Sequence, residues 1–227
     1  RSNSAFVEYR HSFSPNWELK TTYSHTESEE KTQLFYAFAA GGLNADNTGL
    51  YGWPYKSATT TTNQLLDVSV AGRFGAFGRQ HELITGLSYS QQKTDTDAQT
   101  DPTFDSSNPP SLPAFPYANN IYPEPDWVPA ESTQGKQKLA RAYAAARLSL
   151  TDGLKGIVGL NAVRLERSGN SRYGATSTLT SYPNTRKLSP YAGLTYDFTP
   201  DLMGYVSYSD IFQAQEQSDA SGDQLAP

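Results

Sequence analysis

A two-residue hydrophobic period recurs along most of this chain and limits what the chain can fold into. From Leu188 to Phe198 every second residue is apolar or aromatic, and the residues between are small, polar or amphipathic. Successive side chains of a strand point to opposite faces of a sheet, so this period predicts β-strands and not helices. Each strand then has one apolar face and one face that tolerates water and charge.

The same period appears in five other runs. Their apolar-side members are Ala5, Val7, Tyr9 and Phe13; Trp17, Leu19, Thr21 and Tyr23; Leu66, Val68, Val70, Gly72 and Phe74; Leu83, Thr85, Leu87 and Tyr89; and Ala140, Ala142, Ala144, Ala146, Leu148 and Leu150. A further run, 154–167, also has strand character but an ambiguous facing, and another strand follows Asp201. We therefore expect about eight strands in four antiparallel hairpins.

The connections between these strands alternate in length. Short turns rich in Pro, Asn, Asp or Gly close each hairpin, at 14–16, 75–79, 151–153 and 199–201. Long connections join the hairpins, over roughly Glu27–Ala58, Asp95–Thr133 and Ser168–Arg186. Strict alternation places all tight turns at one end of the strands and all long loops at the other, which is typical of outer-membrane barrels.

The charged residues of these runs fall opposite the apolar stripe. They are Glu8, Arg10, Glu18, Lys20, Asp67, Arg73, Arg141, Arg147 and Asp197. Aromatic residues cluster beside the short turns, where an interfacial girdle is expected: Phe13, Trp17, Phe74, Phe77 and Phe198. Because lipid cannot hydrogen-bond a backbone, a strand that crosses it must be paired within a closed sheet and be apolar outside.

We therefore predict an all-β, antiparallel transmembrane β-barrel segment. An ordinary β-sandwich with apolar faces inside is the alternative. The mean hydropathy is −0.61, and no segment resembles a transmembrane helix of about 20 apolar residues. The net charge of −5 gives no reason to expect a nucleic acid partner, and the absence of cysteine excludes disulfides and thiolate metal sites. We expect a middle piece of a larger architecture, truncated at both ends.

Three stretches resemble the TonB-dependent siderophore receptors, specifically the hydroxamate and pyoverdine branch. They are Ser189–Gln215, Leu65–Ser90, and Ile121–Trp127 followed by Ala142–Gly159. The closing residues Asp223–Pro227 resemble the loop after the first of these. The similarity touches nearly the whole chain, so residues 1–227 are expected to form one partial β-barrel domain.

The resemblance implies part of a barrel of about 22 strands, with the family's N-terminal plug domain absent from this chain. It places the protein in the outer membrane of a Gram-negative bacterium, in contact with outer-membrane lipid and as a monomeric barrel. Such receptors bind a ferric siderophore at the outer face and import it with energy delivered by the TonB complex through the plug. The iron arrives inside its chelator, so no directly bound cofactor or metal is implied.

Aromatic residues of the first two long connections are the candidate siderophore-binding residues. They are Tyr51, Trp53 and Tyr55, then Phe115, Tyr117, Tyr122 and Trp127. Tyr and Trp combine apolar area with a hydrogen-bonding tip, which suits a ligand of mixed polarity. These rings could instead pack the loops together or lie at the membrane interface. Which siderophore binds does not follow from the loop composition.

Six charged residues are candidates for the lumen of the barrel: Arg10, Glu18, Lys20, Arg73, Arg141 and Arg147. We expect them to form ion pairs with the plug, although a water-filled lumen would also tolerate them. His11, His25 and His81 are expected to be ordinary surface residues, and Asp95 and Asp97 lack the rest of an EF-hand loop. No enzymatic constellation emerges. The rival functions are a passive porin-like or small structural barrel, and a secreted β-sandwich binding module.

Overall fold

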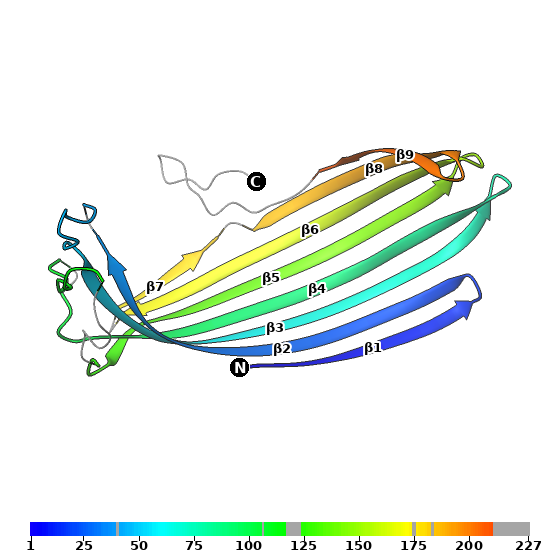
Figure 1. The fold of residues 1–227 in the computed structure, drawn as a ribbon. Helices are drawn as coiled ribbons and strands as arrows, with labels where there is room; N and C mark the ends of the chain where they lie inside the picture. The colour runs from blue at the N-terminus through cyan, green and yellow to red at the C-terminus, as the bar shows by residue number, and fades with distance from the viewer. Residues whose placement is uncertain (40, 106, 117–123, 174–175, 183, 211–227) are drawn as a thin grey trace.

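A computed structural model describes residues 1–39, 41–105, 107–116, 124–173, 176–182 and 184–210. The described residues form nine strands of one antiparallel sheet (Figure 1). The strands are β1 (Ser2–Ser14), β2 (Trp17–Phe38), β3 (Tyr51–Ala76), β4 (Arg79–Thr100), β5 (Val128–Ser149), β6 (Leu154–Tyr173), β7 (Thr176–Ser181), β8 (Thr185–Thr199) and β9 (Leu202–Ser209). Among these residues there is no helix long and apolar enough to span a membrane.

Strand order follows chain order from β1 to β6 and continues through β8 to β9, while the short β7 pairs with the far end of β6. All four short turns lie at one end of the sheet, and the long connections lie at the other (Figure 1). The predicted alternation of turns and loops is therefore confirmed. The sheet is open, with β1 and β9 as its edges.

The strand register shows that the apolar members of successive strands share one side of the sheet. One row across the sheet shows this side, which we call the apolar face: Thr21, Val68, Leu87, Ala142, Ala162 and Leu188. The next row lies on the opposite side, the polar face: Thr22, Asp67, Ser88, Arg141, Val163 and Lys187. The register also settles the facing of β6: Val158, Leu160 and Ala162 pair with Ala146, Ala144 and Ala142, so they lie on the apolar face.

No second sheet covers the apolar face within the described part of the chain. Only Leu112 and Leu165 are buried hydrophobic residues there, whereas Leu87 and Leu188 are more than half exposed. A sandwich would bury this stripe against a partner sheet, so the sandwich alternative is wrong. The nine-residue stretch from Leu66 to Phe74 matches the 9–11 residues with which a tilted strand crosses a bilayer.

The predicted bounds of the long connections are wrong, because the strands run on. The loop between β2 and β3 covers only 39–50, and that between β4 and β5 covers 101–127. The third connection is interrupted by β7, which makes nine strands where about eight were expected. In the middle of these extensions, as at 26–33 of β2 and 90–97 of β4, both faces are polar, so the alternation that marks a strand is lost. Backbone pairing persists, aided by contacts such as that between the Thr59 and Thr96 hydroxyls at 3.0 Å.

The predicted girdle residues do lie beside the short turns. Trp17 and Phe74 are on the apolar face, and Phe77 is 99% exposed at the tip of the β3–β4 turn. This turn places Phe77 at φ 51° and Gly78 at φ 72°, the pair of positive values that a two-residue type I′ hairpin requires.

Candidate functional site

An aromatic surface covers the polar face at the long-connection end of β2 and β3. Tyr36 is the register partner of Trp53, and Phe38 is the register partner of Tyr51. Ring centroids lie 6.3 Å apart for Tyr36 and Tyr55 and 5.9 Å apart for Phe38 and Tyr51. These five residues come from two adjacent strands with a two-residue spacing, so the sheet itself aligns their side chains on one face.

A sixth ring comes from the connection after β4. The Phe104 centroid lies 5.0 Å from that of Trp53, with an interplanar angle of 35°. The chain turns just before Phe104. The turn is held by Asp101, whose Oδ1 accepts hydrogen bonds from the amide and hydroxyl of Thr103 at 2.8 and 2.7 Å. We call the resulting set the aromatic platform: Tyr36, Phe38, Tyr51, Trp53, Tyr55 and Phe104.

The two long connections beside the platform pair with each other through their backbones. The amide of Leu112 donates to the Leu50 carbonyl at 2.8 Å, and the amide of Phe115 donates to the Asn47 carbonyl at 3.0 Å. Leu112 is 7% exposed and fills the junction. The platform is therefore supported by ordered backbone on the described part of both connections.

The platform keeps open surface for a ligand. Trp53 is 42% exposed and Tyr36 is 51% exposed, although each has an aromatic neighbour. Stacked or tilted rings of this kind offer apolar area, and the tyrosine hydroxyls add hydrogen-bonding groups. The arrangement suits a large organic ligand that combines apolar and polar surface.

The structure brings together only some of the predicted aromatic residues. Tyr51, Trp53 and Tyr55 belong to the platform, as strand residues of β3 and not as loop residues. Phe115 contacts the neighbouring connection at Asn47. Tyr117 and Tyr122 lie outside the described residues.

Trp127 lies on the other side of the β2–β3 extension. Its indole Nε1 donates to Glu124 at 2.7 Å, and Glu124 also accepts hydrogen bonds from Gln33. The Lys56 ammonium lies 5.5 Å from the centre of the Trp127 ring. Gln33 and Lys56 are register partners on the side that continues the apolar face. The structure therefore separates Trp127 from the aromatic platform.

Three platform residues, Tyr36, Phe38 and Phe104, are not among the residues predicted from the sequence. The first two belong to the continuous apolar run Leu34–Phe38, within a segment predicted to be a loop. A short apolar run of this length is itself a strand signal, and it was the available one. No local pattern marks Phe104, because its role depends on how a long connection folds back onto β3.

All six predicted lumen charges lie on the polar face. Glu8, missing from that set, links two of them on β1 and β2: it accepts from Arg10 at 2.7 Å and from Lys20 at 2.9 Å. Glu18 lies 3.9 Å from Arg10. These side chains remain about one-third to one-half exposed, so the cluster stays accessible to a further partner.

A second charged cluster lies nearer the short turns. Glu82 on β4 bridges Arg73 on β3 at 3.7 Å and Arg147 on β5 at 3.6 Å. Arg141 lies over the Tyr143 ring at 4.5 Å, and the Tyr143 hydroxyl donates to Asp67 at 3.3 Å. The periodicity places these charges on one face, but their pairing follows from register.

Among the described residues, no three His, Cys, Asp or Glu side chains come together. In the connection between β2 and β3, a turn at Asp46 lowers the pKa of its carboxyl. Hydrogen bonds from the hydroxyl and then the amide of Thr48, at 2.6 and 3.1 Å, hold the pKa of Asp46 below its usual value. Ser107 lowers the pKa of Asp105 in the same way.

Known proteins share both the sequence pattern and the fold. The ferric-pyoverdine BN7/BN8 receptor of Pseudomonas putida is 30% identical over 222 residues, covering 93% of this chain and 26% of that receptor. The pyoverdine outer membrane receptor FpvA from Pseudomonas aeruginosa PAO1, solved with pyoverdine bound, superposes with a TM-score of 0.78 at 25% identity, covering 99% of this chain and 31% of that one.

Receptors with lower sequence identity share the same fold. BauA, the ferric preacinetobactin receptor from Acinetobacter baumannii, superposes with a TM-score of 0.78 at 17% identity, over 100% of this chain and 33% of that one. All three relatives are named as receptors and none as an enzyme. The chain spans about a quarter of the length of the curated relatives that it matches.

The profile of one family, described as TonB dependent receptor-like, beta-barrel, matches residues 1–227. The whole of this chain therefore belongs to the β-barrel of the TonB-dependent receptors.

Proposed function

We propose that this protein is an outer-membrane receptor that binds a ferric siderophore at the aromatic platform and imports it with energy supplied by TonB. One observation carries the proposal: the platform lies on the polar face, at the long-connection end, above the charged clusters of the same face. In a closed barrel of this type, that position would be the outer mouth of the lumen. The pyoverdine ligands named for the relatives support a ligand of that type.

The platform residues would hold the organic shell of the chelate. Flat rings from Tyr51, Trp53 and Tyr55 give apolar contact, and the tyrosine hydroxyls can hydrogen-bond to amide or hydroxamate oxygens. The ferric ion is cargo inside its chelator, so binding needs no protein ligand to the metal. Because β2, β3 and the paired connections support the rings, little ordering is required when the ligand arrives.

The charged clusters of the polar face would contact the plug domain that the family carries. Half-exposed ion pairs contribute only about 0–1 kcal/mol each. Pairs of this strength, such as those of Glu82 with Arg73 and Arg147, can exchange partners when the plug moves. A plug held by such interchangeable contacts can be displaced during import without disrupting the barrel.

Uptake of ⁵⁵Fe-labelled ferric pyoverdine by iron-limited cells tests the proposed function. Deletion of the gene should abolish saturable uptake, and so should deletion of tonB in cells that retain the gene. The purified protein should bind the ferric chelate in the absence of TonB. Unsaturable uptake that persists without TonB would identify a passive porin-like barrel instead. Recovery of the protein only in the secreted fraction would contradict an outer-membrane receptor.

A further inference from the structure

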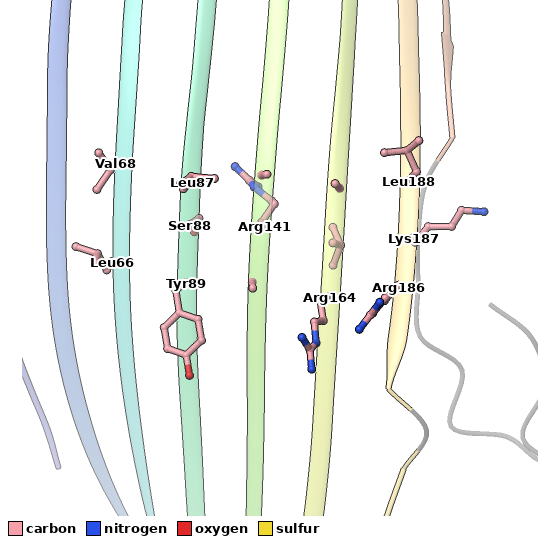
Figure 2. A pocket seen from close by; sticks show the side chains of 14 residues that line it. Leu66, Val68, Leu87, Ser88, Tyr89, Arg141, Arg164, Arg186, Lys187 and Leu188 are labelled. Carbon is pink, nitrogen blue, oxygen red and sulfur yellow. The ribbon is translucent and has the colours of Figure 1, made fainter.

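The two faces of the sheet have hollows of different chemistry. A hollow of the apolar face, shown in Figure 2, is bordered by Leu66, Leu87 and Leu188 and is expected to meet hydrocarbon. A hollow of about 250 Å³ on the polar face is lined mainly by hydroxyl and amide groups instead. The side chains that line it from the polar face are Ser24, Thr26, Asn63, Leu65, Ser90, Gln92 and Gln137.

Three primary amides form a row across the polar hollow. Asn63 on β3 is the register partner of Gln92 on β4, and Gln92 is the register partner of Gln137 on β5. All three residues are exposed, and none of the described residues hydrogen-bonds to their side chains. We call these three residues the amide row. Neighbouring strands place their side chains about 5 Å apart, so the row offers a line of carbonyl acceptors and NH₂ donors to a partner.

The polar face on β2 to β5 is uncharged around the amide row. The next row toward the long connections consists of Ser28, Thr61, Thr94 and Gly135. The next row toward the short turns consists of Ser24, Leu65, Ser90 and Leu139, and the charged row of Asp67 and Arg141 follows it. On β6 the amide row ends at Arg167, which lies over the Tyr182 ring at 4.7 Å. The surroundings therefore favour neutral hydrogen-bonding groups over ions.

Two glycines leave a gap in the polar face beside the amide row. Gly135 on β5 and Gly169 on β6 are register partners, one row nearer the long connections. A Cβ at Gly135 would lie 4.0 Å from its nearest neighbour, and one at Gly169 would lie 3.5 Å from the Gln134 carbonyl oxygen. Packing among the described residues therefore requires neither glycine. Glycine inside a strand often marks a site where a ligand or another backbone approaches closely, so the gap gives a partner access to the amide row.

We propose that the amide row is a second, inner binding site for the chelate, which hydrogen-bonds to its amide or hydroxamate groups after it leaves the aromatic platform. This inference rests on the proposed function, because it requires a siderophore to pass along the polar face. Asn63 lies about 33 Å from Trp53 along β3, too far for one compact chelate to contact both. Hydrogen bonds between exposed neutral groups are individually weak, which suits an intermediate site that must also release its ligand.

Uptake and binding of ferric pyoverdine by the full-length protein test this inference together. The variant N63L/Q92L keeps the side-chain size and removes two amides of the row. It should lower the maximal rate of saturable uptake at least fivefold, while the Kd of the purified protein stays within twofold of the wild-type value. The control Q64L/Q91L removes the adjacent pair of register partners, whose side chains point to the opposite face, and should change neither quantity. Gly135→Val, which fills the gap and leaves the amides intact, should slow uptake as N63L/Q92L does.

Photo-crosslinking identifies what occupies the amide row. With p-benzoylphenylalanine in place of Gln137, illumination of cells during uptake should attach the chelator at this position, whereas the same residue in place of Gln91, on the opposite face, should capture none. Capture of plug peptides alone in place of Gln137 would assign the row to the plug and overturn the inference.

The uptake rates can overturn it as well. Equal rates for N63L/Q92L and the wild type, or equal losses in N63L/Q92L and Q64L/Q91L, would show that the amide row is not an inner site. A loss of affinity as large as the loss of rate would place these amides in the initial binding site and would also overturn the inference. Saturable uptake by the wild type with any of these results removes only this inference, whereas absence of saturable uptake by the wild type counts against the proposed function.

Discussion

The ring centroids of Trp53 and Phe104 lie 5.0 Å apart, although the two residues belong to different parts of the chain. Trp53 is fixed by the register of β3 with β2, whereas Phe104 reaches it because the connection after β4 turns back at Asp101. This contact joins the sheet to a long connection at the place where the proposed ligand binds. The platform therefore depends on both β3 and the connection after β4.

Replacing Trp53 with alanine should weaken binding of the ferric siderophore by about 30-fold. That factor corresponds to about 2 kcal/mol, a usual loss for a central aromatic contact residue. Isothermal titration or quenching of ligand fluorescence would measure it. The control is Trp127→Ala, which removes the same side chain from the opposite side of the β2–β3 extension and should change affinity less than threefold. Equal losses in both variants would show that the platform is not the binding surface.

Removing positive charge from the polar face should change ion conductance through the protein. The variant R73Q/R141Q/R147Q removes three cations from the polar face, so single-channel current in planar bilayers should rise if the proposed contacts with the plug weaken. The control K93Q/K136Q/K138Q removes three lysines from the other face and should leave the current unchanged. Unaltered current in both triple variants would argue against plug-facing arginines.

Gly72→Ala should destabilise the β2–β3 pairing beside the β1–β2 turn by about 1–3 kcal/mol, as overpacking does. A Cβ at Gly72 would lie 2.3 Å from the Trp17 ring and 2.7 Å from the Asn16 carbonyl oxygen, which belongs to the backbone and also accepts from the Arg73 amide. Gly135→Ala is the matched control, because the nearest atom there is 4.0 Å away. Urea unfolding in detergent would compare them, and equal midpoints would show that the Trp17 contact relaxes freely.

The turn at Asp46 should weaken only in acid. Because hydrogen bonds from Thr48 lower the pKa of the folded Asp46 carboxyl, its contribution to the turn is complete above the ordinary value of 3.8. The contribution is lost as the pH falls below 3.8 through the folded pKa. Amide hydrogen exchange at Thr48 should therefore accelerate in that window, beyond the change in intrinsic exchange rate. Asp46→Asn should remove this acid step, and its persistence in that variant would assign it to another group.

The membrane-spanning part of the fold could be predicted from the sequence because hydrocarbon imposes a strict alternation. Val68, Leu87 and Leu188 reveal their facing through that period alone, and the register confirms it. Outside the hydrocarbon zone this constraint ends. The extension through Thr59 to Thr62 is held by backbone pairing and hydroxyl contacts, which leave no hydrophobic period to detect.

The candidate site could be predicted only in part, for a related reason. Trp53 was identified by residue type, but Trp127 has the same type and lies on the other side of the sheet. Side-chain chemistry suggests which residues can bind a chelate, whereas register and loop packing decide which of them share a surface. The facing of β6 was likewise ambiguous until its pairing with β8 was known.

Hydrocarbon should cover the apolar face in the membrane, and site-directed spin labelling tests this directly. The chain contains no cysteine, so single cysteines can be introduced and spin-labelled without background from it. Labels at Leu87, Ala142 and Leu194 in the membrane-embedded protein should collide readily with oxygen and poorly with a water-soluble nickel complex. Labels at their neighbours Ser88, Arg141 and Thr195 should show the reverse preference. Greater access to the nickel complex at the first three positions would show that water, and not hydrocarbon, covers the apolar face.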